Sequence, residues 1–401
     1  MRILILTQYF WPESFKINDL ALALKERGHQ ISVLTAKPNY PTGSFSKGYT
    51  FFNKGKEQWN DIEVYRSPII PRGKGNGLQL FVNYISFAIF ASIKLLFVRN
   101  KFDKIFVYEP SPVTVGIPAI VAKYKFNAPI YFWVQDLWPE SISAAGGVKN
   151  KTVLVLLNGL TKFIYQHCHK VLVQSKAFLP YILNQNVDNS KLVYYPNSTE
   201  KYYKELSPDE SLIKTLPSGV KLIFAGNIGE SQSFETLLNA ALILKNEDVQ
   251  VHWLILGDGR MREFVNQKIK ELNLQDTFHL LGEHPSTDMP KYFSCADALI
   301  VSLKKNPIFA HTIPSKIQSY LACGKPILTS LDGEGSRIIE EAKAGFTSPS
   351  EDPISLAATV KKFLALSIEE QKILGKNARK YFSAEFEREL LVDRLEDILR
   401  N

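Results

Sequence analysis

The sequence predicts an α/β protein built from two doubly wound, Rossmann-like domains that face a cleft. Three observations support this fold class. Short apolar runs rich in β-branched and aromatic residues alternate with helical stretches, which is typical of a parallel sheet covered on both faces. The alternation restarts after a polar, turn-rich stretch near residues 198–218. A chain of 401 residues is also long enough to bury two separate cores.

The first half of the chain supplies one set of strands. Apolar runs bounded by turn formers predict buried strands, and the stretch DLALALKERGH after the first run predicts a helix. The expected strands are RILILTQ, QISVLTA, KIFVYEP, APIYFWVQDL, KVLVQS and KLVYYPN. We therefore expect a first domain over residues 1–200.

The second half repeats the pattern. The stretches FETLLNAALILKN and MREFVNQKIKELNL have helical periodicity and separate the apolar runs. The expected strands lie at 220–227, 251–259, 278–282, 296–303 and 326–331. We expect a second domain over residues 201–380. Because ligands of such sheets bind at the carboxyl ends of the strands, the loops after these runs are the places for functional residues.

Composition and motifs exclude several classes of protein. With 45% hydrophobic and 22% charged residues, the chain is an ordinary folded protein. Its three cysteines are too few for a disulfide framework or a Cys-rich metal site. The cluster His167-Cys168-His169 could bind a metal, but adjacent residues on a helix point apart, which favours a structural role. No Gly-x-Gly-x-x-Gly follows the first strand, which argues against a dinucleotide-dependent oxidoreductase.

Charge is unevenly distributed along the chain. Residues 1–200 hold 23 Lys and Arg against 12 Asp and Glu, whereas residues 201–401 hold 25 against 28. The basic first half indicates an anionic partner, such as nucleic acid, anionic lipid or a phosphorylated acceptor. Nucleic acid is the least supported, because the basic residues are not clustered with stacking aromatic residues. The N-terminal stretch lacks the features of a signal peptide, so we expect a cytoplasmic protein.

Residues 75–93 form a long segment without charge that ends before Lys94. On a helix, Asn83 and Ser86 fall in a narrow polar stripe and large apolar residues occupy the rest. Three interpretations compete: a transmembrane span, a helix in the core of the first domain, and a helix at the surface of a bilayer. The last two are compatible if one face packs on the sheet and the other meets lipid.

Two turns of the second half offer groups for an anion. A strand ends near Gly226 and a helix begins near Ser233, so backbone N–H groups at that helix start would suit phosphate. Gly257 begins a tight turn after the next strand, and Arg260, which follows it, either holds an anion or only lies on the surface of a helix. The candidate residues of these turns are Gly226, Asn227, Gln232, Gly257, Asp258 and Arg260.

The stretch FAHTIPSKIQSYLACGKPIL is the strongest local indication of a bound phosphate. Pro314 suits the first turn of a helix, and Ser315 can satisfy neighbouring donors. Lys316 places a cation beside the same helix N-terminus, which costs stability unless an anion lies between them. Glu334, after the next strand, either accepts hydrogen bonds from sugar hydroxyls or is a solvated loop carboxylate.

The order of these motifs resembles the retaining glycosyltransferases of family 4, which have the two-domain B-type fold. The similarity extends over nearly the whole chain and is greatest for the bacterial cell-surface branch, which includes transferases of N-acetyl-fucosamine for O-antigen and capsule. The stretches that carry it are QYFWPE, RGHQISVLTAKPNYPTG, VQDLWPES, GNIGESQSFETLL, LGDG and TIPSKIQSYLACGKPI.

The resemblance implies partners for each domain. The second domain would hold a UDP-sugar and the first would hold the acceptor, commonly an undecaprenyl-diphosphate-linked saccharide at the inner membrane. The last helix, near 381–401, would pack back on the first domain. The acceptor-binding residues are then Glu13, Asn39 and Tyr40. Neither a cofactor nor a metal is expected, since no Asp-x-Asp motif stands in a suitable loop.

The chain departs from the common family pattern at the donor site. The positions of the usual Arg and Lys read Asn227 and Gln232, and the two glutamates of the E-x7-E pattern align with His311 and Ser319. The branch pattern is intact from Thr312 to Tyr320. We therefore infer that Lys316, with Arg260, binds the diphosphate. The donor-binding residues expected in this stretch are His311, Thr312, Pro314, Ser315, Lys316, Gln318 and Ser319.

The expected reaction is sugar transfer with retention, in which the departing phosphate takes the acceptor proton. Asp136, directly after a strand of the first domain, would orient the acceptor or stabilise the oxocarbenium-like centre. Its structural alternative is to cap the following helix. Two other functions remain open. A UDP-sugar 2-epimerase shares the architecture, and the missing Arg, Lys and Glu are compatible with a non-catalytic nucleotide-sugar-binding protein.

Overall fold

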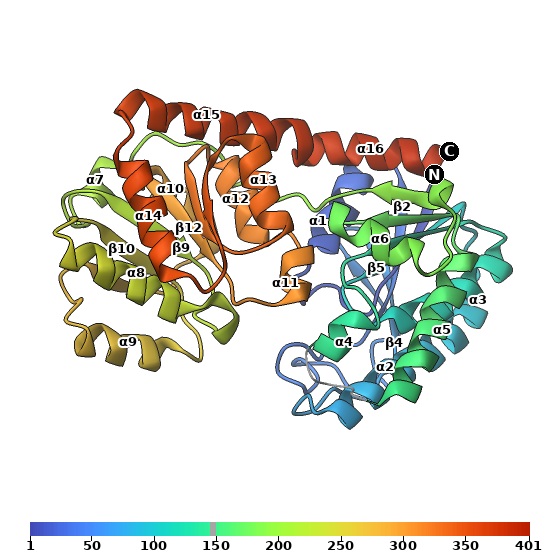
Figure 1. Ribbon diagram of the computed structural model, residues 1–401. Helices are drawn as coiled ribbons and strands as arrows, with labels where there is room; N and C mark the ends of the chain where they lie inside the picture. The colour runs from blue at the N-terminus through green and yellow to red at the C-terminus, as the bar shows by residue number, and fades with distance from the viewer. Residues whose placement is uncertain (145–149) are drawn as a thin grey trace. The chain divides into compact units, whose positions relative to one another are not determined.

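The computed structural model describes residues 1–144 and 150–401 and divides into two compact units (Figure 1). Unit 1 consists of Met1–Pro196 with Val392–Asn401, and unit 2 consists of Asn197–Leu391. The division between the units therefore falls at 196/197 and again at 391/392. Each unit contains one open sheet with helices on both faces, which confirms the predicted fold class.

The sheet of unit 1 has eight strands in the order β3-β4-β2-β1-β5-β6-β7-β8. All neighbouring pairs are parallel except the edge pair β3 and β4, which is antiparallel. The strands are β1 (Arg2–Leu6), β2 (Gln30–Ala36), β3 (Lys56–Trp59), β4 (Ile62–Ser67), β5 (Lys104–Glu109), β6 (Ile130–Val134), β7 (Lys170–Val173) and β8 (Leu192–Tyr194). The sequence did not predict β3 and β4, because KEQW and IEVYRS interrupt their apolar residues with charges.

Helices cover both faces of this sheet. Alternate side chains of a strand point to opposite faces, so Leu4 and Leu6 join the core beneath α2, α3 and α5, whereas Ile3 and Ile5 face the other side. The helices are α1 (Lys16–Glu26), α2 (Gly77–Phe97), α3 (Gly116–Phe126), α4 (Glu140–Ala144), α5 (Lys151–His167) and α6 (Leu179–Leu183), with 3-10 turns η1 (Val113–Val115), η2 (Lys176–Phe178) and η3 (Asn189–Lys191).

The sheet of unit 2 has six parallel strands in the order β11-β10-β9-β12-β13-β14. Leu222 and Phe224 of β9 join a core under α8, α9 and α14, and Ile223 joins a core under α12, α13 and α15. The strands are β9 (Lys221–Ala225), β10 (His252–Leu256), β11 (Phe278–Gly282), β12 (Ala298–Ser302), β13 (Ile327–Ser330) and β14 (Gly345–Ser348).

The helices of unit 2 lie between its strands, except α7, which precedes β9, and α14 and α15, which follow β14. They are α7 (Glu210–Ile213), α8 (Phe234–Asn246), α9 (Arg262–Glu271), α10 (Met289–Ser294), α11 (Pro307–His311), α12 (Ser315–Ala322), α13 (Glu334–Ala342), α14 (Pro353–Leu364) and α15 (Ile368–Glu385), with 3-10 turns η4 (Glu230–Gln232) and η5 (Ser286–Asp288). The expected helix FETLLNAALILKN coincides with α8, so its 3.6-residue periodicity predicted both ends.

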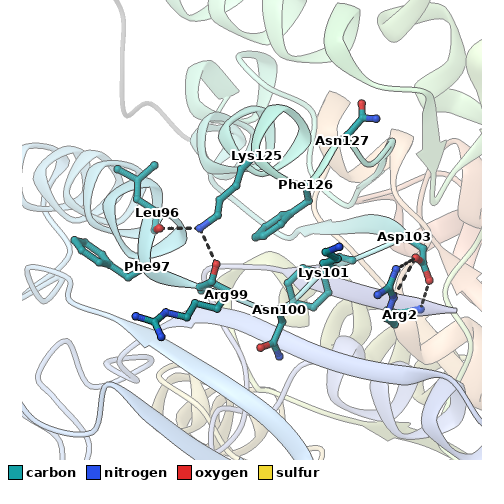
Figure 2. Close-up of a pocket in the computed structure, with 12 residues that line it drawn as sticks. Arg2, Leu96, Phe97, Arg99, Asn100, Lys101, Asp103, Lys125, Phe126 and Asn127 are labelled. Atoms are coloured by element: carbon teal, nitrogen blue, oxygen red, sulfur yellow. Dashed lines mark hydrogen bonds and ion pairs between the residues drawn. The ribbon is translucent and has the colours of Figure 1, made fainter.

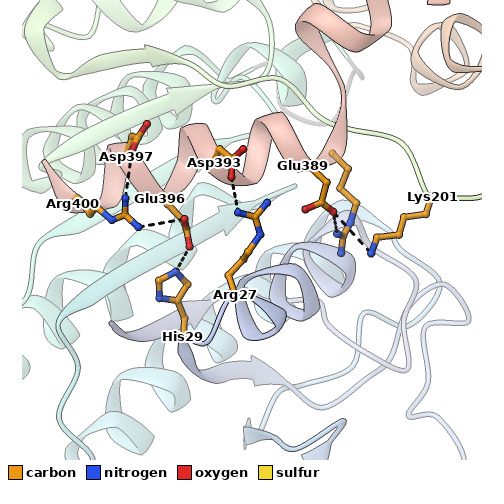
Figure 3. Close-up of polar contacts among 9 residues, drawn as sticks. Arg27, His29, Lys201, Glu389, Asp393, Glu396, Asp397 and Arg400 are labelled. Atoms are coloured by element: carbon orange, nitrogen blue, oxygen red, sulfur yellow. Dashed lines mark hydrogen bonds and ion pairs between the residues drawn. The ribbon is translucent and has the colours of Figure 1, made fainter.

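The last helix, α16 (Arg388–Arg400), carries the C-terminal residues of unit 1 (Figure 3). Asp393 forms an ion pair with Arg27 at 2.6 Å, and Glu396 lies 2.6 Å from Nε2 of His29. These contacts join the end of the chain to the residues that follow α1 and precede β2. Leu395 and Leu399 are fully buried, so apolar packing as well as charge holds this segment on unit 1.

The uncharged segment forms most of α2, whose buried face combines polar residues with apolar ones such as Phe87 and Leu95. Its polar residues Asn83 and Ser86 are buried, and Asn83 bonds the Ile70 carbonyl and the Gln8 amide. The exposed apolar residues are Leu78, Phe81, Ile89, Ile93, Leu96 and Phe97. The helix is long and apolar enough to cross a bilayer, but a third of its most apolar window packs inside unit 1.

Candidate active site

A pocket of about 590 Å³ opens in unit 2 where β9 and β10 end. This is the edge at which doubly wound sheets bind ligands. Its lining residues come from the turns after both strands, from the loop after β11 and from the start of α12. They are Tyr203, Ala225, Gly226, Asn227, Gln232, Leu256, Gly257, Asp258, Glu283, His284, Ser286, Met289, Phe293, Ser315, Lys316, Ser319 and Tyr320.

Two glycines allow the turns after β9 and β10 to approach each other. Gly226 and Gly257 have φ angles of 138° and 140°, which L side chains rarely adopt. A Cβ on Gly257 would lie 2.0 Å from the Gly226 carbonyl oxygen, and a Cβ on Gly226 would lie 2.6 Å from Cε of Lys316. Any side chain here would therefore displace the neighbouring backbone or the lysine.

Lys316 is the central cation of this pocket. Its ammonium group donates to Oε1 of Gln232 and lies 3.7 Å from the centroid of the Phe224 ring. Burial lowers the pKa of Lys316 to about 7, because removal from water penalises the charged form. Lys316 belongs to the first turn of α12, whose free backbone N–H groups carry partial positive charge. Among the described residues, burial is the one cause of this shift and no carboxylate offsets it, so a bound phosphate would supply a compensating charge.

Tyr320 holds α12 against the end of β9. Its hydroxyl oxygen accepts a hydrogen bond of 2.9 Å from the backbone N–H of Ala225, and its ring is buried. Ser319, one residue earlier, shares a hydrogen bond of 2.9 Å with Thr199. The Ser and Tyr of the SKIQSY motif therefore fix the helix start relative to the strand end, which places Lys316.

The structure brings eight of the predicted donor-binding residues into this one pocket. They are Gly226, Asn227, Gln232, Gly257, Asp258, Ser315, Lys316 and Ser319. Asp258 accepts a hydrogen bond from the Gly259 N–H and pairs with Arg262 at 3.2 Å, so its carboxylate shapes the turn.

The other predicted donor-binding residues do not line this pocket. They are Arg260, His311, Thr312, Pro314, Gln318 and Glu334. Gln318 is buried and donates to the Asn197 carbonyl, and the Thr312 hydroxyl donates to the Phe309 carbonyl. Pro314 is the N-cap residue of α12 rather than part of its first turn. Glu334 is buried at the start of α13, where both its oxygens accept from Arg337 at 2.9 Å.

Four polar residues of the pocket were missed by sequence reasoning: Tyr203, Glu283, His284 and Ser286. Glu283 and His284 follow β11, and His284 contacts the hydroxyl of Tyr292 at 3.3 Å. Their position after a strand was a usable signal in the sequence, since every loop after a parallel strand is a candidate position for functional residues. The sequence does not show, however, that β11 lies beside β10, which is what brings this loop to the pocket.

Asp136 lies in unit 1, two residues beyond the end of β6. Burial raises the pKa of its carboxyl group to about 6, and the Ser141 hydroxyl and the Leu137 N–H oppose that shift. The helix α4 begins only at Glu140, so Asp136 does not occupy the N-cap position that its structural alternative requires.

Glu109 is a second carboxyl group at this edge of the sheet, and sequence reasoning missed it. It ends β5, the neighbour of β6, and is fully buried. Burial, together with the negative charge of Asp136, raises the pKa of Glu109 well above its usual value. Neighbouring carboxyl groups whose pKa values are shifted by burial and by charge are typical of functional sites.

The predicted acceptor-binding residues also lie together in unit 1. Oε1 of Glu13 accepts hydrogen bonds of 2.8 Å from the backbone N–H groups of Asn39 and Tyr40. Burial raises the pKa of Glu13 to about 7, although these two N–H groups oppose the shift. Asn39 is buried and accepts from the Arg72 N–H. Glu13 and Asn39 therefore hold the loop, and Tyr40 is the member exposed to solvent.

Arg72 adds a cation to this group that sequence reasoning did not identify. Its guanidinium lies 5.0 Å from the centroid of the Tyr40 ring. Tyr40 in turn packs against the rings of Tyr9 and Phe15. An arginine beside an exposed aromatic ring suits an anionic saccharide derivative, because it offers both charge and a stacking surface.

Within residues 1–144 and 150–401, no three His, Cys, Asp or Glu side chains gather closely enough to hold a metal ion. Cys168 is buried, and its thiol donates to the Ile164 carbonyl, whereas His167 and His169 contact the carbonyls of Phe163 and Asn401.

Comparison with known families agrees with both units. Residues 16–198 match the family described as glycosyl transferase 4-like domain, and residues 214–381 match glycosyl transferases group 1. Together the two matches cover most of the chain. They identify it as a glycosyltransferase with the two-domain B-type fold.

Curated relatives are named as glycosyltransferases, and a solved structure shares the fold. The probable glycosyltransferase WbjE of Pseudomonas aeruginosa is 27% identical over 69% of this chain and 71% of its own. The putative colanic acid biosynthesis glycosyl transferase WcaI of Escherichia coli K12 is 24% identical over 81% and 82%. HepE of Anabaena, solved in complex with UDP, superposes with a TM-score of 0.71 at 14% identity over the whole of both chains.

Proposed function

We propose that this glycosyltransferase moves a sugar from a UDP-sugar to a lipid-linked saccharide, with retention of configuration, in the synthesis of a bacterial surface polysaccharide. The observation that carries the proposal is Lys316, a partly desolvated amine at the start of α12 in the 590 Å³ pocket. A diphosphate is the ligand that matches this lysine and the helix N-terminus together.

The donor proposal has two further supports. HepE of Anabaena shares the fold and was solved with UDP, and the pocket extends from Lys316 to the loop after β11. We place the diphosphate at Lys316 and Ser315, and the nucleoside toward Glu283 and His284. An N-acetylated deoxyhexosamine such as N-acetyl-fucosamine is the sugar we propose, because the SKIQSY branch pattern is intact.

The proposed mechanism relies on positioning and on charge stabilisation. The acceptor hydroxyl attacks the anomeric carbon on the face from which UDP leaves, and a departing phosphate oxygen takes the hydroxyl proton. Lys316 and the N–H groups of α12 stabilise the negative charge that develops on UDP. These groups supply positive charge without a metal ion, so we propose a reaction that needs neither a metal nor a cofactor.

The acceptor is assigned to unit 1. Asp136, ionised above pH 6, is proposed to orient the acceptor hydroxyl or stabilise the oxocarbenium-like centre. The raised pKa of neighbouring Glu109 disfavours a second negative charge at this edge of the sheet. Arg72 and Tyr40 are proposed to hold the diphosphate and a sugar ring of the acceptor.

Membrane attachment follows from the acceptor's chemistry. An undecaprenyl-diphosphate-linked saccharide stays at the bilayer, and unit 1 contains the basic half of the chain and the outward apolar row of α2. We propose a peripheral position on the inner face of the cell membrane. WbjE and WcaI carry the names of a glycosyltransferase and a colanic acid biosynthesis enzyme, which fits this setting.

A direct test combines binding and turnover. UDP-sugars are screened for thermal stabilisation, and the best donor is incubated with membranes that contain lipid-linked acceptors. Transfer of the labelled sugar to lipid, with UDP released in equal amount, would support the proposal. Conversion of the donor to its 2-epimer without an acceptor would identify an epimerase. Donor binding with neither product, for every acceptor tried, would indicate a non-catalytic binding protein.

A further inference from the structure

A second pocket, of about 1060 Å³, lies in unit 1 at the opposite edge of the sheet from Asp136 (Figure 2). It opens where α2 ends and where β1 and β5 begin. The lining residues are Arg2, Leu96, Phe97, Val98, Arg99, Asn100, Lys101, Phe102, Asp103, Lys125, Phe126 and Asn127. Because β6 ends at the other edge of the sheet, this pocket is separate from the acceptor site proposed above.

The lining of this pocket is positively charged. Asp103 is the one carboxylate among its lining residues, and it pairs with Arg2 at 2.5 Å and 3.1 Å. Figure 2 shows Lys125 reaching across to the end of α2, where its ammonium group donates to the carbonyls of Leu96 and Val98 at 2.7 Å and 2.6 Å. The remaining cations, Arg99 and Lys101, are exposed. An anion in the pocket would therefore meet uncompensated positive charge.

The rim of the same pocket is apolar. Leu96 and Phe97 are 63% and 76% exposed. Leu96 also continues the outward row of α2 through Ile93 and Ile89, spaced by three and four residues so that they share one helix face. Large apolar side chains held in water next to cations are typical of proteins that lie on a bilayer.

We propose that this pocket binds the phosphate of an anionic membrane phospholipid, while Leu96, Phe97 and the outward row of α2 enter the acyl region. A soluble phosphate compound would engage Arg99 and Lys101 but would leave the apolar rim in water. An acyl chain attached to the phosphate accounts for both features. The inference rests on the proposed membrane attachment of unit 1 and adds the site that selects anionic lipid.

Vesicle sedimentation tests the site. Wild-type protein is mixed with vesicles of phosphatidylcholine alone and of phosphatidylcholine with about 30% phosphatidylglycerol, a typical anionic lipid. The double variant R99E/K101E is compared with K376E/K380E, which changes net charge equally on exposed lysines of α15 in unit 2. We expect R99E/K101E to weaken binding to anionic vesicles at least about tenfold, and the control variant to change it much less.

A third variant, L96S/F97S, tests the apolar rim. It should weaken binding to both kinds of vesicle, because it removes insertion rather than charge recognition. A circular dichroism spectrum and a thermal unfolding curve like those of the wild type would confirm that each variant is folded. The last experiment measures by thermal shift whether inorganic phosphate stabilises the protein, because phosphate carries the same charged group without a lipid tail.

Each remaining outcome overturns the proposal. Equal losses in the two charge-reversal variants would show that net charge, not this pocket, selects anionic lipid. Stabilisation by inorganic phosphate that R99E/K101E abolishes, with vesicle binding unaffected, would indicate a phosphate site unrelated to the membrane. A wild type that binds neither vesicle would refute the membrane attachment itself. UDP binding and sugar transfer would still test the enzymatic proposal separately.

Discussion

The low pKa of Lys316 makes a specific prediction about the pH dependence of UDP binding. The ligand-free pKa is about 7, against 10.5 for an ordinary lysine, because burial penalises the ammonium form. A diphosphate next to Lys316 would raise that pKa again, since an opposite charge favours the ammonium ion. UDP binding should therefore take up a proton at pH values between the pKa of Lys316 in the free protein and its pKa in the complex.

The direction and the size of the pH effect on UDP affinity follow from this linkage. Affinity is fully present below pH 7, where Lys316 is already charged, and falls as pH rises toward the pKa of the complex. Between pH 7.5 and 9 the charged fraction of a group with a pKa of 7 falls about 25-fold, which corresponds to about 2 kcal/mol of binding free energy. UDP itself is fully ionised over this range, because its terminal phosphate titrates near pH 6.

Isothermal titration calorimetry in buffers of different ionisation enthalpy measures both the Kd for UDP and the number of protons taken up on binding. We expect the Kd for UDP to rise by roughly this factor in the wild type, with close to one proton taken up at pH 8.5. Lys316→Met should bind more weakly at pH 7.5 and show no such dependence. Lys304→Met is the matched control, because Lys304 is an exposed lysine of unit 2 that pairs with Glu230. A wild-type Kd independent of pH, or an equal slope in Lys316→Met, would refute the reasoning.

Four further predictions concern the two sites. Asp136→Asn should lower kcat by about 100-fold or more while leaving the Kd for UDP unchanged. Wild-type activity should fall as pH drops through about 6, where Asp136 becomes protonated. A variant with the same pH–rate profile as the wild type would contradict a catalytic role for Asp136. Gly257→Ala should destabilise unit 2 by about 1–3 kcal/mol in denaturant titrations and weaken UDP binding. The reason is that the added Cβ would lie 2.0 Å from a carbonyl oxygen. The control is Gly159→Ala, whose Cβ meets nothing within 4 Å, and it should be tolerated. Arg72→Met should raise KM for the acceptor in steady-state kinetics with no effect on UDP binding, and an unchanged KM would remove Arg72 from the acceptor site. EDTA should leave initial rates unchanged, and a loss restored by Mg²⁺ would show that the reaction needs a metal.

Local sequence signals located much of the proposed donor pocket. Gly226 and Gly257 each follow an apolar strand, and their positions in the turn could be recognised without knowledge of the fold. Lys316 was recognisable because a cation at a helix start is unfavourable without an anion. Glu334 shows the limit of such signals. It also follows a strand, but its partner Arg337 lies one turn along the same helix, and only coordinates show that the two side chains bond.

The sequence by itself determined the two α/β units, because the period of its apolar residues depends only on the geometry of strands and helices. It also indicated a phosphate site at the start of α12. The tertiary structure alone decided which loops share a pocket, since the strand order that sets β11 beside β10 is not written in local pattern. It also decided the faces of α2, where buried Asn83 satisfies partners from distant parts of the chain, Phe87 and Leu95 pack inside, and other large apolar side chains are exposed. Such contacts depend on what packs against each face, and that is a property of the folded whole.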